Sequence, residues 1–435
     1  MFITARVPLL VGLGVVPVVL LASAGMSPWL LSVGWLVLCV TLAMVDASAA
    51  ARPRSLSIER VLPRRARLGE QVETELWLHN TSDRRLHGLA RDAWQPTAGA
   101  SPARLVVDVA GGERQRLVVP LLPRRRGELR SEFVMVRSLG PLGLAGRQGR
   151  IDARGAIRVL PPFNSRRHLP SRLARLRELD GNTSVQVRGQ GTEFDSLREY
   201  VRGDDVRSID WRATARAGHT MLRTWRPERD RHVVILIDTG RTSAARVGDG
   251  VRLDASMEAA LLLAALATRA GDHVHLVMFD RAVRGRVTGV DGAALLPALV
   301  DAMAPVEPQL IDTDWDAAFA QVRALTSRPS LVVLLTAQDA AESARGLLGS
   351  LPRLARSAHV LIGSATDTAL HDIAAERRTA EEVYRAASAE RTLRDAARLA
   401  AAVGRAGAEA ITDTPEALPP RIADRYLALK AAGRL

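Results

Sequence analysis

The fold of this chain is decided by residues 191–238, which read GTEFDSLREYVRGDDVRSIDWRATARAGHTMLRTWRPERDRHVVILID. Acidic and basic side chains crowd this segment. Among them lie two tryptophans, a tyrosine and a phenylalanine, in a chain that is only 4% aromatic. A buried core does not tolerate so many charges unless they are paired. The last part, 232–238, is an apolar run typical of a strand buried on both faces. We therefore expect an ordered, charged element that leads directly into an α/β domain.

Beyond residue 232 the sequence alternates apolar strands with helical patterns. Strands are predicted at 232–238, 273–279, 331–336, 359–362 and 408–412. Helices are predicted at 253–270, 293–303, 315–325, 379–403 and 416–432. This order predicts a doubly wound parallel sheet over residues 232–435. Ligands of that class bind beyond the carboxyl ends of the strands, and Asp238 lies at such an end.

Residues 55–160 have a different pattern, in which short strands are separated by turn residues. Strands are predicted at 72–78, 104–109, 115–121 and 133–136. Alternating polar and apolar residues in 73–78 indicate a strand with one solvent-exposed face. Many short strands at this spacing predict a small β-sandwich. Residues 161–231 then form a linker, with a short amphipathic helix at 171–179, and most of the charged segment.

The first 50 residues contain two apolar stretches, 7–24 and 28–45. Each is close to the ~20 residues that a helix needs to cross a bilayer. Arginines precede the first stretch and follow the second, so the positive-inside rule places both ends in the cytoplasm. We expect a transmembrane helical hairpin in the cell membrane, with the soluble domains in the cytoplasm. The alternative is that the first stretch is a cleaved signal peptide.

Composition narrows the classes of function. The net charge is +13, carried almost entirely by arginine, and Lys430 is the only lysine. No P-loop lysine is therefore available for nucleotide hydrolysis. Cys39 is the only cysteine, so the chain has neither an internal disulfide framework nor a cysteine metal site. The positive charge favours anionic partners and leaves polyanion binding at the membrane as an alternative function, although no nucleic-acid motif is present and no nucleic acid is expected.

A candidate metal site follows the strand 232–238. Asp238, Thr239, Gly240, Arg241 and Thr242 place a carboxylate and hydroxyls in a loop at the carboxyl end of that strand. Oxygen ligands of this kind suit a hard divalent cation such as Mg²⁺. The loop resembles the metal-ion-dependent adhesion site of von Willebrand factor A domains, which has the form Asp-x-Ser-x-Ser.

That resemblance makes Asp238, Thr242 and Thr313 the candidate metal ligands, with Thr313 in the place of the distant threonine. The site is degenerate, because Gly240 replaces the first hydroxyl and Ala337 stands where an aspartate is expected. Asp339 and Asp314 are the nearest carboxylates that could compensate. His273 and His275, on one face of a predicted strand, are candidate metal ligands or locally hydrogen-bonded core residues. No other cofactor is indicated.

The charged segment 191–216, followed by the strand to Asp238, resembles a bacterial family catalogued as domain of unknown function 58. Segments 124–127, 138–144 and 424–435 are similar to that family too. The signature residues that carry the resemblance are Glu193, Phe194, Arg198, Tyr200, Gly203, Asp204, Asp205, Arg207, Asp210, Trp211, Arg212 and Arg216.

The resemblance implies a protein of the bacterial inner membrane with a von Willebrand factor A-like domain. It also implies a MoxR-type AAA ATPase as partner, often together with a transglutaminase-like membrane protein, and a role in protein assembly or maturation. No enzymatic activity is established for that family, so a binding or scaffold function without catalytic residues is expected.

Two interpretations of the signature residues remain open. In the first, arginines and carboxylates pair within the segment, and Trp211 and Trp225 anchor it against the sheet. In the second, the charges face a partner, since arginine and tryptophan dominate interface energetics. A further alternative is a metal-dependent enzyme that uses Asp204, Asp205 and Asp210, although neighbouring arginines would compete for those carboxylates.

Overall fold

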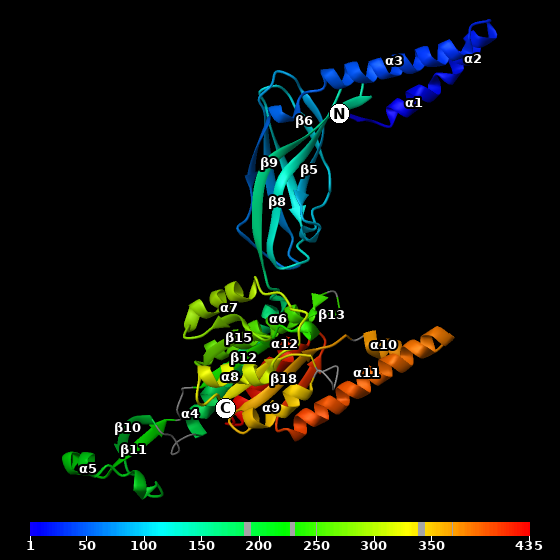
Figure 1. Cartoon of the computed structure of the whole chain (residues 1–435). Coiled ribbons are helices and arrows are strands. Elements are labelled where there is room, and N and C mark those ends of the chain that lie inside the picture. Colours follow the sequence, from blue (N-terminus) through cyan, green and yellow to red (C-terminus); the bar gives the residue numbers. More distant parts are fainter. Residues whose placement is uncertain (187–192, 227–230, 249, 338–343, 368) are drawn as a thin grey trace. The chain divides into compact units, whose positions relative to one another are not determined.

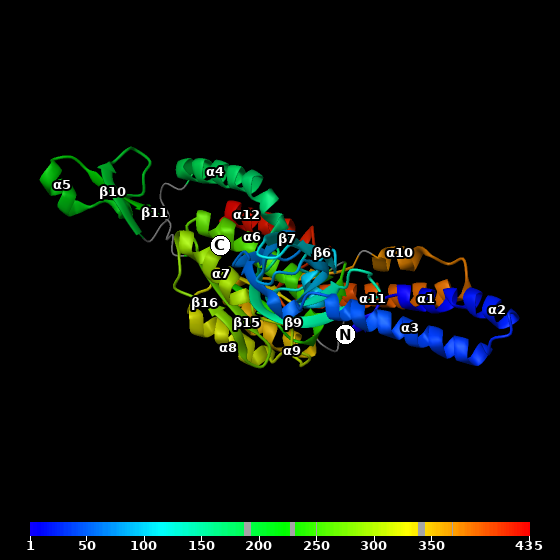
Figure 2. The same ribbon diagram turned by 90° about the horizontal axis from the view of Figure 1, so that it is seen from above.

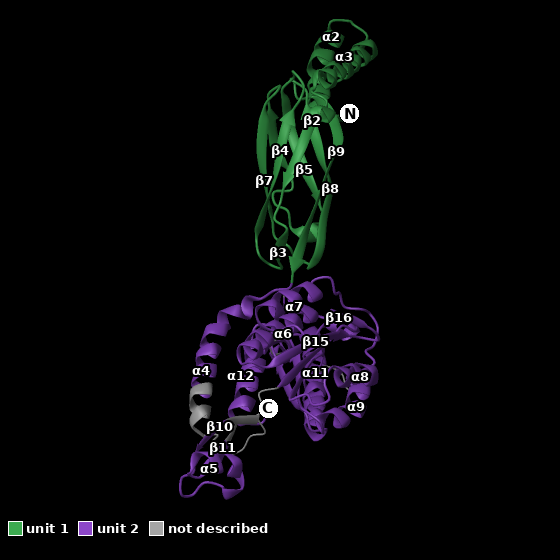
Figure 3. Cartoon of the chain, turned by 90° about the vertical axis from the view of Figure 1, so that its left-hand side faces the viewer, with its two compact units in different colours: residues 1–160 green, residues 161–435 purple. Residues whose placement is uncertain are grey.

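The computed structural model describes residues 1–186, 193–226, 231–248, 250–337, 344–367 and 369–435. Within these ranges the side chains of 180–186, 193–195, 224–226 and 371 are outside the description. The chain divides into two compact units, residues 1–160 and 161–435 (Figure 3).

The first unit begins with three apolar helices, α1 (Arg6–Leu13), α2 (Val15–Ser23) and α3 (Pro28–Ala49). Residues 6–23 and 28–55 are each long and apolar enough to cross a membrane. The α1–α2 segment runs beside α3 in both views (Figures 1 and 2). Trp35 Nε1 donates a hydrogen bond to the Leu10 carbonyl at 3.2 Å. A Cβ at Gly14 would lie 2.0 Å from that indole nitrogen, so glycine permits the close approach of the two segments.

The rest of the first unit is a sandwich of two sheets. Its strands are β1 (Phe2–Ile3), β2 (Leu56–Val61), β3 (Arg65–Arg67), β4 (Val72–Asn80), β5 (Leu86–Trp94), β6 (Leu105–Val109), β7 (Arg114–Leu121), β8 (Gly127–Leu139) and β9 (Ala145–Leu160). One sheet has the order β1-β9-β8-β5-β6, with β3 paired to β9, and the other has the order β2-β4-β7. Leucines and valines that alternate along both sheets form the shared core.

A buried carboxylate joins the third helix to the sandwich. Asp46, on the last turn of α3, is 1% exposed. It accepts hydrogen bonds from the backbone N–H groups of Leu142, Leu144 and Ala145 at 2.7, 2.7 and 2.9 Å. Leu142 and Leu144 lie in the turn between β8 and β9, and Ala145 is the first residue of β9. The segment 138–144 therefore serves as the attachment point of the apolar helices.

The second unit is built on a six-stranded sheet. Its strands are β12 (His232–Asp238), β15 (His273–Phe279), β16 (Val283–Val287), β17 (Leu331–Leu335), β18 (His359–Ala365) and β19 (Glu409–Asp413). They lie in the order β16-β15-β12-β17-β18-β19. All neighbouring pairs are parallel except β15 and β16, which are antiparallel. The five strands predicted from the sequence thus pair in parallel. β16, which was not predicted, is antiparallel because the short turn after β15 returns the chain in the opposite direction.

Helices cover both faces of this sheet (Figure 1). The α-helices of residues 161–186 and 252–435 are α4 (Leu169–Gln186), α6 (Arg252–Arg269), α7 (Leu295–Met303), α8 (Trp315–Leu325), α9 (Arg345–Ala355), α10 (Ala369–Ala375), α11 (Ala380–Arg405) and α12 (Leu418–Ala431). Of these, α10 packs against α11, and α4 packs against α6 and α12. One core cluster joins α8, α9 and α11 to alternate residues of the strands, such as Val234 and Leu236. The alanine- and leucine-rich α6 is buried along almost its whole length and packs against α4 and α12.

Residues 193–226 fold as a small separate motif, which we call the 193–226 module. It contains β10 (Glu193–Glu199), a 3-10 turn (Val206–Ser208), α5 (Trp211–Ala217) and β11 (Met221–Arg226). β10 and β11 pair antiparallel. A second short pair, β13 (Arg246–Val247) and β14 (Gly250–Val251), precedes α6.

Three histidines meet at the amino-terminal edge of the sheet. A hydrogen bond of 2.9 Å joins His232 Nδ1 to His275 Nε2, and another of 2.9 Å joins His275 Nδ1 to the Thr288 hydroxyl. Both ring nitrogens of His275 are thus engaged by protein groups, which favours the core interpretation over metal binding. Burial lowers the pKa of His275, and the neighbouring His232 and His273 lower it further.

We predict that Asp46→Asn destabilises the first unit. An amide offers one oxygen where the carboxylate offers two, and each buried N–H left unsatisfied costs about 1 to 3 kcal/mol. Thermal unfolding of the full chain in detergent measures the effect. The exposed Asp83→Asn on the same unit is the control, and equal melting of both variants and wild type would contradict the prediction.

We also predict that the second unit loses stability as the pH falls below about 6.5, the ordinary pKa of histidine. The folded-state pKa of His275 is lowered, so the unfolded chain takes up protons first and acid favours unfolding. Burial lowers the pKa values of His168 and His359 in the same direction. Melting temperatures measured from about pH 8 to pH 5 test this. His275→Gln should flatten the slope, and an unchanged slope in that variant would refute the assignment.

Candidate functional site

Asp238 lies where the strand order of the sheet reverses. It is the last residue of β12. β15, the next strand of this sheet in the sequence, lies on one side of β12, and the later strand β17 lies on the other side. In open α/β sheets this point leaves a crevice beyond the carboxyl ends of the strands, where ligands bind. The Asp238 side chain is only 3% exposed, so its carboxylate requires hydrogen-bond partners.

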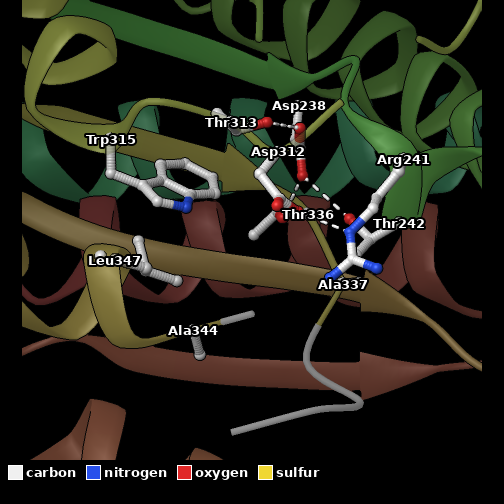
Figure 4. Close-up of a pocket in the computed structure, with 11 residues that line it drawn as sticks. Asp238, Arg241, Thr242, Asp312, Thr313, Trp315, Thr336, Ala337, Ala344 and Leu347 are labelled. Carbon is white, nitrogen blue, oxygen red and sulfur yellow. Dashed lines mark hydrogen bonds and ion pairs between the residues drawn. The ribbon is translucent and has the colours of Figure 1, made fainter. Parts of the chain in front are cut away.

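Three threonine hydroxyls and one backbone N–H supply those partners (Figure 4). Oδ1 accepts from the Gly240 N–H at 2.8 Å and from the Thr313 hydroxyl at 2.5 Å. Oδ2 accepts from the Thr336 hydroxyl at 2.6 Å and from the Thr242 hydroxyl at 3.2 Å. The structure therefore brings together all three predicted ligands, Asp238, Thr242 and Thr313.

Gly240 is required by close packing. A Cβ at this position would lie 2.5 Å from the Thr313 hydroxyl oxygen and 2.9 Å from the Ile311 carbonyl oxygen. The Thr313 hydroxyl thus occupies the space that a side chain at 240 would need. The Thr313–Asp238 hydrogen bond therefore leaves no room for a side chain at position 240, which accounts for the missing hydroxyl there.

Backbone hydrogen bonds hold the Thr313 loop against the Asp238 loop. The Arg241 N–H donates to the Ile311 carbonyl at 2.8 Å, and the Gln309 N–H donates to the Thr239 carbonyl at 2.7 Å. The Asp314 N–H donates to the Asp280 carbonyl at 2.8 Å. Residues far apart in the sequence are therefore positioned by the main chain.

Asp280, at the end of the neighbouring strand β15, is a second buried carboxylate that the sequence analysis missed. Arg284 donates to both of its oxygens, at 2.7 and 3.0 Å, and the Thr239 hydroxyl donates at 2.8 Å. Burial by itself would raise the pKa of Asp280, but the hydrogen bonds from Arg284, from the Arg281 and Ala282 N–H groups and from Thr239 outweigh it and lower that pKa. Asp280 thus holds the Asp238 loop through Thr239, and its carboxylate is ion-paired with Arg284.

A pocket of about 260 Å³ opens beside Asp238. It is lined by Asp238, Arg241, Thr242, Asp312, Thr313, Trp315, Thr336, Ala337, Ala344, Gly346 and Leu347. Its polar side carries the threonines and an Arg241–Asp312 ion pair at 2.5 Å. Its other side is formed by Trp315, Ala344 and Leu347, as Figure 4 shows. The pocket therefore combines a polar side, which carries Asp238 and the Arg241–Asp312 pair, with an apolar wall.

The oxygen atoms around Asp238 are the kind of ligand that a hard cation prefers, but together they carry little negative charge. Asp238, Thr242, Thr313 and Thr336 converge as oxygen donors, and Asp238 is the single carboxylate among them. Asp314 does not compensate, because it caps α8 by accepting from the Ala317 N–H at 3.0 Å. Asp339 lies outside the described residues. Mg²⁺ bound here would be held by these four residues and completed by water, with low affinity.

The acidic signature residues whose side chains are described, Asp204, Asp205 and Asp210, make contacts within the module. Asp204 pairs with Arg198 at 2.7 Å and accepts from the Val201 N–H. Asp205 caps the 3-10 turn through the Arg207 N–H at 2.9 Å. The hydrogen bond from Arg198 lowers the pKa of Asp204. These two carboxylates thus have structural partners in the described part of the module, which leaves the metal-dependent enzyme with little geometric support.

Asp210 has the same kind of role. Its carboxylate caps α5 by accepting from the Arg212 and Ala213 N–H groups at 3.0 Å and pairs with Arg223 at 2.8 Å. The Ala213 N–H and Arg223 lower its pKa. Gly203 has a φ of 110°, a conformation that favours glycine in the turn beside Asp204.

The expectation that Trp211 anchors the segment against the sheet is wrong. Trp211 is 71% exposed and is the first residue of α5, which Asp210 caps. Tyr200 donates its backbone N–H to Thr220, while Arg207, Arg212 and Arg216 are exposed. Glu193 and Phe194 lie on β10 by their backbone. Their side chains, and that of Trp225, are outside the described part of the chain.

Thr336 and Asp280 are the site residues that sequence reasoning did not find. A signal was present for both, since each directly follows an apolar strand at the edge where Asp238 lies. An aspartate was expected after the strand that ends near Thr336, but the threonine itself turns toward Asp238.

We predict that Gly240→Ser destabilises the second unit by about 1 to 3 kcal/mol, the usual cost of overpacking a buried site. Gly250→Ser is the matched control, because a Cβ there would have no heavy atom within 4 Å. Adding Thr313→Ala to Gly240→Ser should restore part of the loss by vacating the contested space. Thermal unfolding measures all three variants, and equal melting of Gly240→Ser and Gly250→Ser would disprove the packing argument.

Residues 196–394 match the model of a family described as Protein of unknown function DUF58. No curated protein matches the chain. Solved structures with similarity include alpha-2-macroglobulin from Escherichia coli (19% identity, 26% of this chain and 17% of that chain, TM-score 0.19). A second is a CARDB domain from Pyrococcus furiosus in complex with di-metal ions (15% identity, 26% of this chain and 91% of that chain, TM-score 0.18). A third is the complex of Zinc 2-glycoprotein with Prolactin inducible protein from human seminal plasma (11% identity, 26% of this chain and 98% of that chain, TM-score 0.21).

The chain spans about a sixth of the length of the alpha-2-macroglobulin that it matches, 17%. These structural similarities are too low to support an argument about function. The sequence signature is the informative finding, because the matched region contains both the 193–226 module from Ser196 onward and the Asp238 site. Residues 196–394 of this chain are thus similar to the DUF58 family.

Proposed function

We propose that this protein is a membrane-anchored, cytoplasm-facing binding or scaffold protein that acts with a MoxR-type AAA ATPase in protein assembly or maturation. The ATPase would supply ATP hydrolysis, and this chain would supply the docking site at the membrane. The observation that carries the proposal is the pocket beside Asp238, in which threonines from three separate segments surround one buried carboxylate.

The second unit is proposed to be a von Willebrand factor A-like domain. Its strand order, its antiparallel edge strand and the position of Asp238, Thr242 and Thr313 support this interpretation. A pocket with one polar and one apolar side suits the recognition of a protein segment, in which polar groups orient the ligand and apolar contacts add affinity. Mg²⁺ held at Asp238 would supply a positive charge to a ligand carboxylate.

The apolar helices and the arginines that flank them support anchoring in the bacterial inner membrane with both soluble units in the cytoplasm. Asp46 would then couple the anchor to the sandwich without a flexible linker. A transglutaminase-like membrane protein is a further proposed partner.

Co-purification of the tagged full-length chain from detergent extract tests the proposal. Wild type should recover a MoxR-type AAA ATPase, and Asp238→Asn should recover at least tenfold less. Glu381→Gln, an exposed change on α11, is the control and should behave like wild type. Repeated failure of wild type to recover an AAA ATPase would overturn the proposed partnership. Recovery by Asp238→Asn equal to wild type would exclude the Asp238 pocket as its binding site.

A further inference from the structure

Exposed apolar and cationic residues alternate along the 193–226 module, and we call this set of residues the exposed face of the module. Val201, Val206 and Trp211 are exposed by 61%, 60% and 71%. Each is followed directly by an exposed arginine, at positions 202, 207 and 212. The pairs recur every five residues, through a turn, the 3-10 segment and the start of α5. Arg216 adds a fourth exposed arginine one helical turn after Arg212.

Three carboxylates of the module make contacts inside it. Asp204 binds Arg198, Asp205 caps the 3-10 turn, and Asp210 caps α5 and binds Arg223. These contacts hold the segment in one conformation while leaving its outer arginines directed to solvent. Arg202, Arg207, Arg212 and Arg216 outnumber the exposed Glu199 and Asp205, so the described exposed side chains of this set carry a net positive charge.

We infer that this face binds the acidic surface of a protein partner, with Trp211 as the central apolar anchor. The identity of the partner, the AAA ATPase, rests on the proposed function. Arginine forks bind carboxylates in fixed bidentate geometry, and arginine with tryptophan dominates interface hot spots. An anionic bilayer needs no such geometry. The helix cap and ion pair of Asp210 instead preorganise the face, which reduces the entropic cost of binding a structured partner.

Photo-crosslinking in cells locates the contact. p-Benzoylphenylalanine is placed at position 206 or 211 of the full-length chain, and at Tyr384, which is 79% exposed on α11, as the control position. The expected result is a crosslink from 206 and 211, but not from 384, to an acidic segment of the ATPase identified by mass spectrometry. Crosslinks from 206 and 211 to lipid, to a second copy of this chain or to nothing would overturn the inference.

Affinity measurements then test the chemistry, with the full-length chain in nanodiscs and the purified ATPase. Trp211→Ala should raise the Kd about thirtyfold, the loss typical of a hot spot, and Arg212→Glu with Arg216→Glu should raise it at least as much. Arg385→Glu with Arg391→Glu makes the same charge change on exposed residues of α11 and should leave the Kd unchanged.

The two proposals fail in different ways. If the ATPase binds wild type and the Arg212→Glu/Arg216→Glu variant equally, the docking face is wrong while the partnership stands. If wild type binds no AAA ATPase, the partnership is wrong and the face loses the partner that we assign to it.

Discussion

The burial of a single carboxylate organises the edge of the sheet at which β12 ends. Asp238 ends a strand in the middle of the sheet, where hydration is lost and a charge must be compensated by hydrogen bonds. The compensation comes from Thr242, Thr313 and Thr336, which belong to three separate segments. Satisfying one group therefore determines the course of two loops and the end of a neighbouring strand. The pocket is a consequence of that requirement.

The same principle recurs elsewhere in the chain. Asp46 organises the turn that attaches the apolar helices, Asp280 holds the loop beside Asp238, and Asp210 caps the helix of the 193–226 module. In each case a carboxylate binds several N–H or O–H donors at once and thereby fixes local geometry. This chain has almost no lysine and many arginines, so the carboxylates are the scarcer charged groups and most of those described here have structural roles.

The sequence predicted the helices and strands that have a long apolar pattern. It did not predict strands whose formation depends on pairing with a neighbouring strand. The strands β12 and β15 and helix α8 occur at the predicted residues, because each has a continuous or periodic apolar pattern. β9 was missed, since glycines and arginines interrupt its pattern and its pairing with β8 supplies the order. β16 was missed because most of its residues are exposed on the edge of the sheet. Pairing between strands is a tertiary property that no local pattern records.

By itself, the sequence determined the apolar helices, the change from a strand-rich to an alternating α/β pattern, and the identity of Asp238, Thr242 and Thr313 as a related set. These features follow from local hydrophobicity and from a short motif. Only the tertiary structure decided that Thr336 completes the set, that Thr313 fills the space beside Gly240, and that Trp211 is exposed. Each of these depends on the distance between segments remote in the sequence, which packing and hydrogen bonding set together.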